Sequence, residues 1–224
     1  YYETQPDFER VGERVSFGTS GHRGSSLSGT FTETHVLAIT QAICDFRIAH
    51  GINGPLLVGK DTHALSAPAQ HTVLEVLAGN QVETTLQSGD EVTPTPVISW
   101  AILNRNRGRT ERLADGIIIT PSHNPPEDAG LKYNSVDGGP SDTTKTRWIE
   151  NRANEIMRDS LKAVKRLTYE AALRAPTTSE TDFLLPYIQE LDRVVDMKCI
   201  RDSRLRMGVN PLGGASTRYW DVIR

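Results

Sequence analysis

The stretch Gly116-Ile117-Ile118-Ile119-Thr120-Pro121-Ser122-His123-Asn124-Pro125-Pro126 decides the fold. The apolar run 116–119 is typical of a buried strand, and the prolines that follow end that strand. A serine and a histidine therefore lie in a turn at the carboxyl end of a strand. Open α/β sheets gather their ligand-binding residues at such ends. We expect this turn to hold the functional residues of the chain, with Ser122 at its centre.

Short apolar runs alternate with helical patterns on both sides of this turn. This alternation is typical of βαβ units, which form a sheet covered by helices on both faces. The sequence therefore predicts an α/β fold with a mainly parallel mixed sheet. Strands are expected at 14–17, 55–59, 82–86 and 116–119, and helices at 30–50, 66–79, 94–103 and 141–157.

A second unit is expected near the end of the sequence. Residues 162–180 show no clear periodicity and are interpreted as a connector. They are followed by a helical pattern over 181–195, a strand pattern over 205–210 and another helical pattern that continues to Arg224. One βα unit cannot bury its own faces, because three or more strands are usually needed. We therefore predict a first domain at 1–178 and the beginning of a truncated second α/β domain at 179–224.

The composition narrows the class of protein. The chain has 224 residues, of which 37% are hydrophobic and 24% charged, as in a globular protein. No apolar run approaches the length of a membrane span, and the first residues do not form a signal peptide. The net charge of −3 gives no reason to expect nucleic acid as a partner. Cys44 and Cys199 are expected to be buried free thiols of a cytoplasmic protein. The sequence makes no prediction of oligomeric state.

The stretch Gly18-Thr19-Ser20-Gly21-His22-Arg23-Gly24-Ser25-Ser26 combines glycines, hydroxyls, a histidine and an arginine. It suits a flexible surface loop, but it also suits a loop that offers backbone N–H groups to an anion. Arg23 favours contact with phosphate or carboxylate, because a guanidinium binds those oxygens in a bidentate manner. Lys60-Asp61-Thr62-His63 also follows a strand. A solvated turn explains that stretch at least as well as a site does.

The residues around Ser122 leave three interpretations open. A hydrolase nucleophile would need a base and, in α/β-hydrolases, a Gly-x-Ser-x-Gly elbow, whereas prolines and no glycines flank this serine. Ser-His-Asn is also ordinary turn chemistry. The third interpretation is a phosphoacceptor, whose phosphoryl group brings about two negative charges and needs cations nearby. The candidate cations are Arg23, Lys132, His22 and His123.

Phosphoryl transfer depends mostly on positioning and on stabilisation of charge. A proton must leave the accepting hydroxyl, and another must return to the serine oxygen as that oxygen leaves. Lys132 or His123 could move these protons if its pKa were suitably shifted. A divalent cation normally neutralises the phosphoryl donor. The sequence shows no convincing metal-binding pattern, because its acidic residues are scattered.

Four stretches, in this order, resemble the α-D-phosphohexomutase superfamily, and most of all its bacterial phosphoglucomutase branch. The similarity runs from about residue 1 to the end of the chain and includes residues 208–214. In that family four domains surround one cleft, and the first three share an α/β core. The four stretches are Ser16-Phe17-Gly18-Thr19-Ser20-Gly21-His22-Arg23-Gly24, Gly59-Lys60-Asp61-Thr62-His63, Thr93-Pro94-Thr95-Pro96 and 120–134.

The resemblance implies a role for each matching residue. Ser122 would be the phosphorylated serine, and its phosphoryl oxygen would also bind Mg²⁺. Lys132 and His123 would transfer protons. The substrate-binding residues would be Thr19, Ser20, Arg23 and Lys132, with Arg23 also counted as catalytic.

The same resemblance implies a reaction. The phosphoserine would donate to glucose 1-phosphate, and the resulting glucose 1,6-bisphosphate would return its other phosphate to leave glucose 6-phosphate. A phosphomannose or phosphoglucosamine mutase, or a non-catalytic relative, is the alternative.

Two parts of the family's active site do not occur in this sequence. One is the metal-binding loop of the form Asp-x-Asp-x-Asp-Arg, and the other is the set of later loops that bind the sugar and its non-reacting phosphate. We therefore expect these 224 residues alone to have negligible mutase activity.

Overall fold

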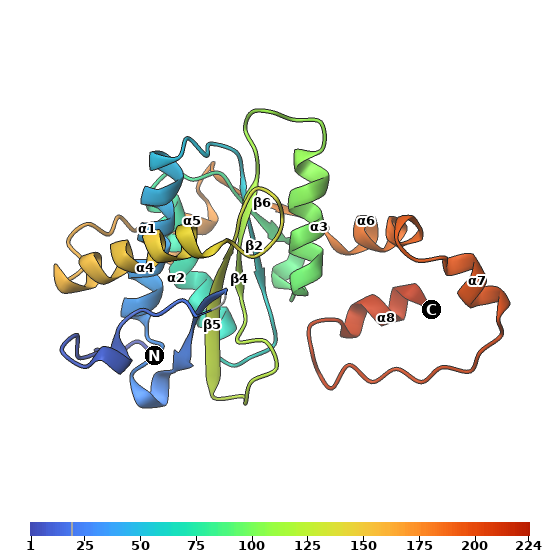
Figure 1. Cartoon of the computed structure of the whole chain (residues 1–224), viewed down its shortest axis with the longest axis horizontal. Coiled ribbons are helices and arrows are strands. Elements are labelled where there is room, and N and C mark those ends of the chain that lie inside the picture. Colours follow the sequence, from blue (N-terminus) through green and yellow to red (C-terminus); the bar gives the residue numbers. More distant parts are fainter. Residues whose placement is uncertain (19) are drawn as a thin grey trace.

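A computed structural model describes residues 1–18 and 20–224, which include one six-stranded sheet in the order β1-β5-β4-β2-β3-β6 (Figure 1). Parallel pairing joins β4 to β2, β2 to β3 and β3 to β6, whereas β5 is antiparallel to both β4 and β1. The predicted mixed, mainly parallel α/β sheet is confirmed. The strands are β1 (Gly21–Ser25), β2 (Leu56–Lys60), β3 (Thr84–Gln87), β4 (Asp115–Ile119), β5 (Asp128–Asn134) and β6 (Thr178–Thr181).

Helices cover both faces of the sheet. Four of them (α1, α2, α4 and α5) contribute to the core on one face, and α3, α6 and α8 contribute to the core on the other. Figure 1 shows the first group on one side of the strands and α3 on the opposite side. The helices are α1 (Glu33–Ala49), α2 (Ser66–Gly79), α3 (Thr95–Asn106), α4 (Thr143–Arg158), α5 (Tyr169–Leu173), α6 (Leu184–Gln189), α7 (Met197–Asp202) and α8 (Thr217–Ile223).

The apolar run of β4 supplies side chains to both cores. Ile117 and Ile119 lie in the core under α1, α2 and α4, and Ile118 lies in the core under α3. Successive residues of a strand point to opposite faces, so an uninterrupted apolar run is what a strand covered on both sides requires. This central strand carries Ser122 just beyond its carboxyl end.

The first strand lies later in the chain than the sequence predicts. Residues 14–17 form no strand, although Val15 and Phe17 are buried in the core. Strand β1 is instead built from Gly21–Ser25, within the glycine-rich stretch. Its residues are not apolar, and its position is fixed by pairing with β5. This part of the glycine-rich stretch is therefore an ordered edge strand and not a flexible loop.

The region 162–180, interpreted from the sequence as a connector, contains α5 and most of β6. Strand β6 pairs in parallel with β3, and Thr84 lies opposite Thr178. The domain boundary expected after residue 178 thus falls inside a strand, and the first sheet extends to Thr181. The division into two domains remains a prediction.

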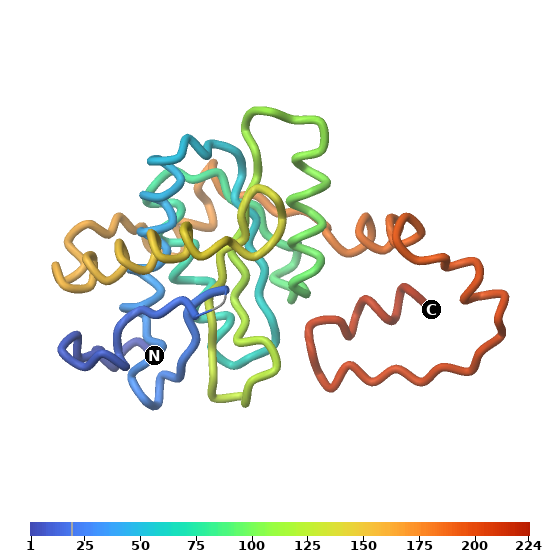
Figure 2. Tube along the Cα trace, viewed as in Figure 1, coloured from blue at the N-terminus to red at the C-terminus, as the bar shows by residue number. Residues whose placement is uncertain are grey.

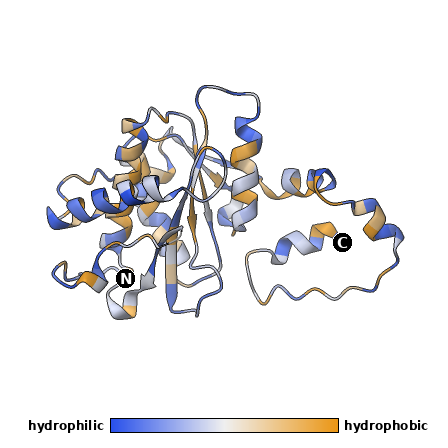
Figure 3. Ribbon diagram, in the orientation of Figure 1, coloured by the Kyte–Doolittle hydropathy of each residue, from blue (hydrophilic) through white to orange (hydrophobic). Residues whose placement is uncertain are grey.

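Residues 182–224 form short helices and no strand (Figure 2). The trace leaves the sheet after β6, runs through α6 and α7, and doubles back to α8. The strand expected at 205–210 is absent from this described segment, and the long helix expected over 181–195 is limited to α6 and one 3₁₀ turn. Figure 3 shows hydrophobic residues along the segment, in α7 and α8 among other places.

The two cysteines differ in their surroundings. Cys44 is buried in the core, as expected, and burial raises the pKa of its thiol to about 12. Cys199 is an exposed free thiol on α7, so the expectation of burial was wrong for this residue. Among the helices that the structure describes, none has the length and apolar character needed to cross a membrane.

Candidate functional site

Ser122 lies in the turn that follows β4, and its backbone has a positive φ of 82°. Few residues other than glycine adopt such a conformation, so the surrounding structure must hold it. The Ser122 N–H donates to Thr120 Oγ1 at 2.9 Å, and the Thr120 N–H donates to the carbonyl of Gly130 at 2.9 Å. A Cβ at Gly130 would lie 2.5 Å from the Thr120 carbonyl oxygen. Glycine is therefore required where β5 passes the turn.

Two cations reach the Ser122 hydroxyl from neighbouring strands. Lys132 Nζ on β5 donates to Ser122 Oγ at 2.6 Å, and a guanidinium nitrogen of Arg23 on β1 donates to it at 3.3 Å. In the register of these strands, Gly21 lies opposite Lys132 and Arg23 lies opposite Gly130. Arg23 and Lys132 are thus diagonal neighbours on one face of the sheet, close enough for long side chains to meet at one point.

The surroundings of Ser122 lower the pKa of Lys132. Partial burial and the nearby Arg23 guanidinium lower the pKa of the Lys132 ammonium, although Asp61 acts in the opposite direction. A lysine with a lowered pKa gives up its proton more readily and is suited to general acid–base chemistry. An anion attached to Ser122 Oγ would be held between two positive charges, one of which can also deliver a proton to that oxygen.

A cleft of about 260 Å³ opens beside Ser122. It lies at the carboxyl ends of β2 and β4, where ligands bind in sheets of this kind. The Thr93 hydroxyl is buried there, and it has no hydrogen-bond partner among the described residues. The residues that line the cleft are Asp61, Thr62, His63, Thr93, Pro94, Thr95, Pro96, Thr120, Ser122, Gly214 and Ala215.

The structure shows no hydrogen bond between Ser122 Oγ and the side chains of the other described site residues predicted from the sequence. His123 is exposed on the turn next to Ser122. Ser20 is partly exposed in the turn before β1, and no hydrogen bond joins its side chain to another described residue. Thr19 lies outside the described residues. Ser122, Lys132 and Arg23 therefore form the group that the structure brings together.

His22, a candidate phosphate ligand from the sequence, is not part of this group. Its ring is buried and stacks on His35 with ring centroids 5.0 Å apart. One ring nitrogen lies 2.8 Å from the Thr30 carbonyl oxygen, and the other accepts from the Ser16 N–H at 3.2 Å. Burial, with a smaller contribution from His35, lowers the pKa of His22 to about 4. His22 is thus a neutral structural residue.

The pair Asp61 and His63 at the end of β2 is a feature of the site that sequence reasoning left undecided. The His63 ring lies 2.8 Å from Asp61 Oδ2 and 3.0 Å from the carbonyl oxygen of Asn124, in the Ser122 turn. The available signal was the position of Lys60-Asp61-Thr62-His63 after a buried strand. Lys60 itself points elsewhere, because it is buried and bonded to Gln70 and Asp90.

The charged groups around Ser122 do not form a metal site by themselves. No cluster of three or more His, Cys, Asp or Glu side chains suited to a metal ion occurs in residues 1–18 and 20–224. The side chains bonded to Ser122 Oγ are cations, and Asp61 is engaged by His63 and Ser66. A Mg²⁺ ion would therefore need a phosphoryl oxygen on Ser122 and further ligands from outside the described residues.

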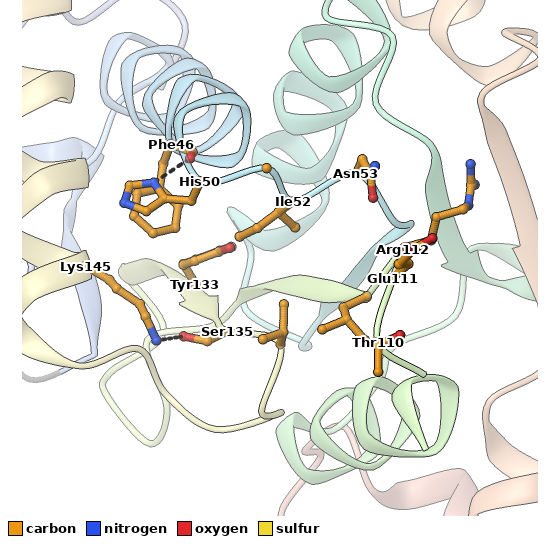
Figure 4. Close-up of a pocket in the computed structure, with 13 residues that line it drawn as sticks. Phe46, His50, Ile52, Asn53, Thr110, Glu111, Arg112, Tyr133, Ser135 and Lys145 are labelled. Carbon is orange, nitrogen blue, oxygen red and sulfur yellow. Dashed lines mark hydrogen bonds between the residues drawn. The ribbon is translucent and has the colours of Figure 1, made fainter. Parts of the chain in front are cut away.

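A second cavity, of about 480 Å³, contrasts with this cleft (Figure 4). It is lined by Phe46 and His50 at the end of α1 and by Tyr133 and Ser135 at the end of β5. Its Lys145 is bonded to Ser135 Oγ and paired with Asp142. Figure 4 shows Phe46, His50 and Tyr133 on one side of the cavity and polar or charged side chains, Glu111 and Arg112 among them, on the other. With its lysine already paired, this cavity is less suited to an anion than the Ser122 cleft.

Comparisons with known proteins show what this chain is similar to. A protein named phosphoglucomutase from Komagataeibacter xylinus is 54% identical over 223 residues, which are 100% of this chain and 40% of that protein. The structure of pp63/parafusin (phosphoglucomutase) from Paramecium, in an open form, has the same fold, with a TM-score of 0.77 and 20% identity, and the match covers 98% of this chain and 42% of that one.

A putative phosphomannomutase from Thermus thermophilus has a TM-score of 0.65 and 26% identity over 83% of this chain and 37% of that one. The chain thus spans about 40% of the length of these relatives. The sequence profile described as phosphoglucomutase/phosphomannomutase, alpha/beta/alpha domain I, matches residues 14–160. The chain belongs to the phosphoglucomutase/phosphomannomutase family and contains its α/β/α domain I.

Proposed function

We propose that this chain is the phosphoryl-carrying part of a phosphoglucomutase, with Ser122 as the residue that bears the phosphoryl group. The observation that carries the proposal is the convergence of Lys132 Nζ and the Arg23 guanidinium on Ser122 Oγ, at 2.6 and 3.3 Å. The 54% identity to the Komagataeibacter xylinus phosphoglucomutase supports glucose phosphates as substrates. The cleft beside Ser122 is the proposed place for the sugar.

The transfer step can be written with these residues. The bond between phosphorus and Ser122 Oγ breaks, and a new bond forms between phosphorus and a hydroxyl oxygen of glucose 1-phosphate. The Lys132 ammonium donates a proton to Ser122 Oγ as this oxygen leaves, and Arg23 stabilises the charge on the transferring group. His123, exposed beside Ser122, is the proposed acceptor of the proton from the sugar hydroxyl.

The product of this step is glucose 1,6-bisphosphate. After the bisphosphate turns in the cleft, the same bonds break and form in reverse at its other phosphate. Ser122 is phosphorylated again and glucose 6-phosphate is released. In this second half the proton flow reverses, so Lys132 takes the proton of the serine hydroxyl. A lysine with a lowered pKa suits both directions.

Mg²⁺ is the proposed cofactor, bound through a phosphoryl oxygen of Ser122. Such an ion would neutralise negative charge on the phosphoryl donor. The described residues offer no second ligand cluster for it. We therefore assign it no step in the transfer, and we expect the 224 residues alone to show negligible turnover of glucose 1-phosphate.

The experiment is labelling of the full-length protein that contains this chain with glucose 1,6-bisphosphate, followed by intact-mass measurement. We expect one added phosphoryl group, which Ser122→Ala abolishes. Ser203→Ala is the matched control, because Ser203 is an exposed serine on α7's carboxyl end and should leave labelling unchanged. A wild-type protein that takes no label would favour a non-catalytic relative and end the proposal.

The choice of sugar is tested separately. We expect the labelled full-length protein to pass its phosphoryl group to glucose 1-phosphate faster than to mannose 1-phosphate or glucosamine 1-phosphate. The similarity to a putative phosphomannomutase makes the mannose comparison necessary. Faster transfer to either competitor would keep the phosphoserine chemistry and replace glucose as the substrate.

A further inference from the structure

A chain of hydrogen bonds connects the end of β2 to the Ser122 turn. Both oxygens of the Asp61 carboxylate accept hydrogen bonds. Oδ2 lies 2.8 Å from His63 Nδ1, and Oδ1 accepts from the His63 N–H at 3.0 Å and from Ser66 Oγ at 2.5 Å. The Asp61 N–H donates to the carbonyl of Ile119, the last residue of β4, at 3.1 Å. The carboxylate of Asp61 is thus fixed beside the strand that leads to Ser122.

The second ring nitrogen of His63 completes the connection. Nε2 lies 3.0 Å from the carbonyl oxygen of Asn124, two residues after Ser122. A carbonyl oxygen only accepts hydrogen bonds, so Nε2 must carry a proton. The Asp61 carboxylate also accepts, so Nδ1 must carry a proton as well. A histidine that makes both bonds is therefore an imidazolium, with one positive charge.

The surroundings of His63 favour this charged form. Burial of the ring opposes it, but hydrogen bonding to the Asn124 carbonyl and to Asp61, together with the charges of Asp61 and Asp128, leaves the pKa of His63 raised. Among the described residues, the charged groups that face the ring are Asp61 from its own turn and Asp128 from the start of β5. Ser66 from α2 and the threonines of the cleft carry no charge.

The turn itself needs such a support. A residue with the φ of Ser122 is strained, and this conformation persists only when its neighbours hold it. On the amino side, Thr120 Oγ1 accepts from the Ser122 N–H. On the carboxyl side, Asn124 is held twice, by His63 at its carbonyl and by Asp128 at its side-chain amide, the latter at 3.0 Å.

We propose that His63, held as an imidazolium by Asp61, is a positioning residue that fixes Asn124 and thereby keeps Ser122 Oγ in reach of Lys132 and Arg23. This inference rests on the proposed function of Ser122 as phosphoryl carrier. His63 acts through the backbone of the turn. It is therefore distinct from Lys132 and Arg23, which contact Ser122 Oγ directly.

The kinetic test measures single-turnover phosphoryl transfer from phosphorylated full-length protein to glucose 1-phosphate. We expect His63→Ala to lower the rate at saturating substrate by about 10- to 100-fold, because a small displacement of the reacting oxygen is costly. The concentration of substrate that gives half the maximal rate should change little. His63→Arg keeps the positive charge and has donors for both Asp61 Oδ2 and the Asn124 carbonyl oxygen. It should therefore restore the rate to within about threefold of wild type. The residual loss would reflect a slightly displaced turn.

The pH profile separates positioning from simple packing. The wild-type rate should fall as the pH rises through the pKa of His63, because the ring then loses one of its two donated bonds. In His63→Arg this inflection should be absent, because a guanidinium stays protonated. His50→Gln is the matched control, since His50 lies at the other cavity and should leave both rate and profile unchanged. Failure of His63→Arg to restore the rate, or an unchanged rate in His63→Ala, would overturn the proposal.

A spectroscopic readout keeps this test independent of the reaction. Nitrogen NMR of the imidazole in the unphosphorylated full-length protein should show both nitrogens of His63 protonated at neutral pH. Asp61→Asn should return the ring to a neutral form. A neutral His63 in the wild-type protein would overturn the proposed positioning role of His63, even if Ser122 is labelled. Absence of labelling with a charged His63 would instead count against the proposed function alone.

Discussion

Residues 1–181 and 182–224 carry apolar side chains in similar patterns but bury them to very different degrees. Ile117 in β4 is 0% exposed, whereas Leu205 and Met207, in the pattern that predicts a strand, are 69% and 66% exposed. In the first region every strand has a hydrogen-bonded neighbour, and in the second the alternating residues find none. Alternation marks a segment that could form a strand, but pairing is what makes it one.

The second region contacts the first mainly through its apolar residues. Phe183, Leu184 and Tyr219 join the core under α3, and Tyr219 meets Tyr187 edge to face with ring centroids 6.0 Å apart. Around these contacts a mostly apolar cavity of about 710 Å³ lies between α3 and the helices α6 to α8. The first region is therefore densely packed on both faces of its sheet, whereas the second region encloses an apolar cavity. Stability should depend on the first region far more than on the second.

The largest effect should come from the buried ion pair of the first region. Asp115 is fully buried, accepts from Tyr133 at 2.6 Å and pairs with Arg47. Asp115→Ala leaves the Arg47 charge without a partner, so we expect a loss of about 3–5 kcal/mol in the free energy of unfolding. Urea denaturation of the wild-type and variant proteins measures this loss in the free energy of unfolding. Lys198→Ala, which breaks the exposed pair with Asp202 in the second region, should cause no measurable loss.

A cavity in the first core should cost somewhat less. Ile117→Ala removes buried methyl and methylene groups where the neighbours cannot collapse fully, so we expect a loss of about 3 kcal/mol in the free energy of unfolding. The same urea experiment measures it, with Ile117→Val as a graded control at roughly 1 kcal/mol. Equal losses for the alanine and valine variants would contradict dense packing around β4.

Acid should destabilise the first region through its buried histidine. The folded state holds the pKa of His22 at about 4, below the ordinary 6.5, so the unfolded chain binds protons more readily between these values. Stability is therefore complete above pH 6.5 and is lost as the pH falls towards 4. Between pH 7 and pH 5 the loss should be about 2 kcal/mol.

Chemical denaturation at the two pH values measures this loss. His22→Gln should flatten the dependence, whereas the exposed His50→Gln should not. Residues 182–224 contain no histidine, so they add nothing to this dependence. A dependence that is equally steep in His22→Gln would assign it to other groups.

The smallest effect should come from the apolar residues of the second region. Leu212 is 88% exposed, so Leu212→Ser should change the free energy of unfolding by no more than about 0.5 kcal/mol. Thermal denaturation of wild type and variant side by side is sufficient. A loss as large as that of Ile117→Ala would mean that Leu212 is buried in solution, and the contrast between the two regions would disappear.

Much of the fold could be predicted from the sequence where side chains alone determine the element. The run of β4 and the helical spacing of α1 and α2 are examples, because burial on two faces or on one face leaves a periodic trace. Strand β1 left no such trace, since Gly21–Ser25 has no apolar side chain and is held by backbone pairing with β5. Strand β5 does have alternating core residues, Ala129, Leu131 and Tyr133. The glycine and lysine between them made this alternation hard to recognise in the sequence.

The site was predictable in its chemistry and not in its geometry. Serine, lysine and arginine are the types that phosphoryl transfer needs, and the sequence supplies each beside a turn or a glycine. Which histidine lies near Ser122 depends on contacts between distant segments. His22 is directed into the core by His35 and Thr30, and His63 is drawn to the turn by Asp61 and Asn124. No local pattern encodes those choices.

The edge position of β1 has a consequence for the order in which the chain folds. In the described sheet β1 pairs only with β5, and the residues that meet, such as Arg23 and Gly130, are far apart in the sequence. Pairings over such separations form late, because the intervening chain must first be closed into a loop. During synthesis, Arg23 emerges about one hundred residues before Ser122 but must wait for β5 before it can reach the serine. Of the two cations, Arg23 is therefore translated before Lys132 but is expected to reach Ser122 last.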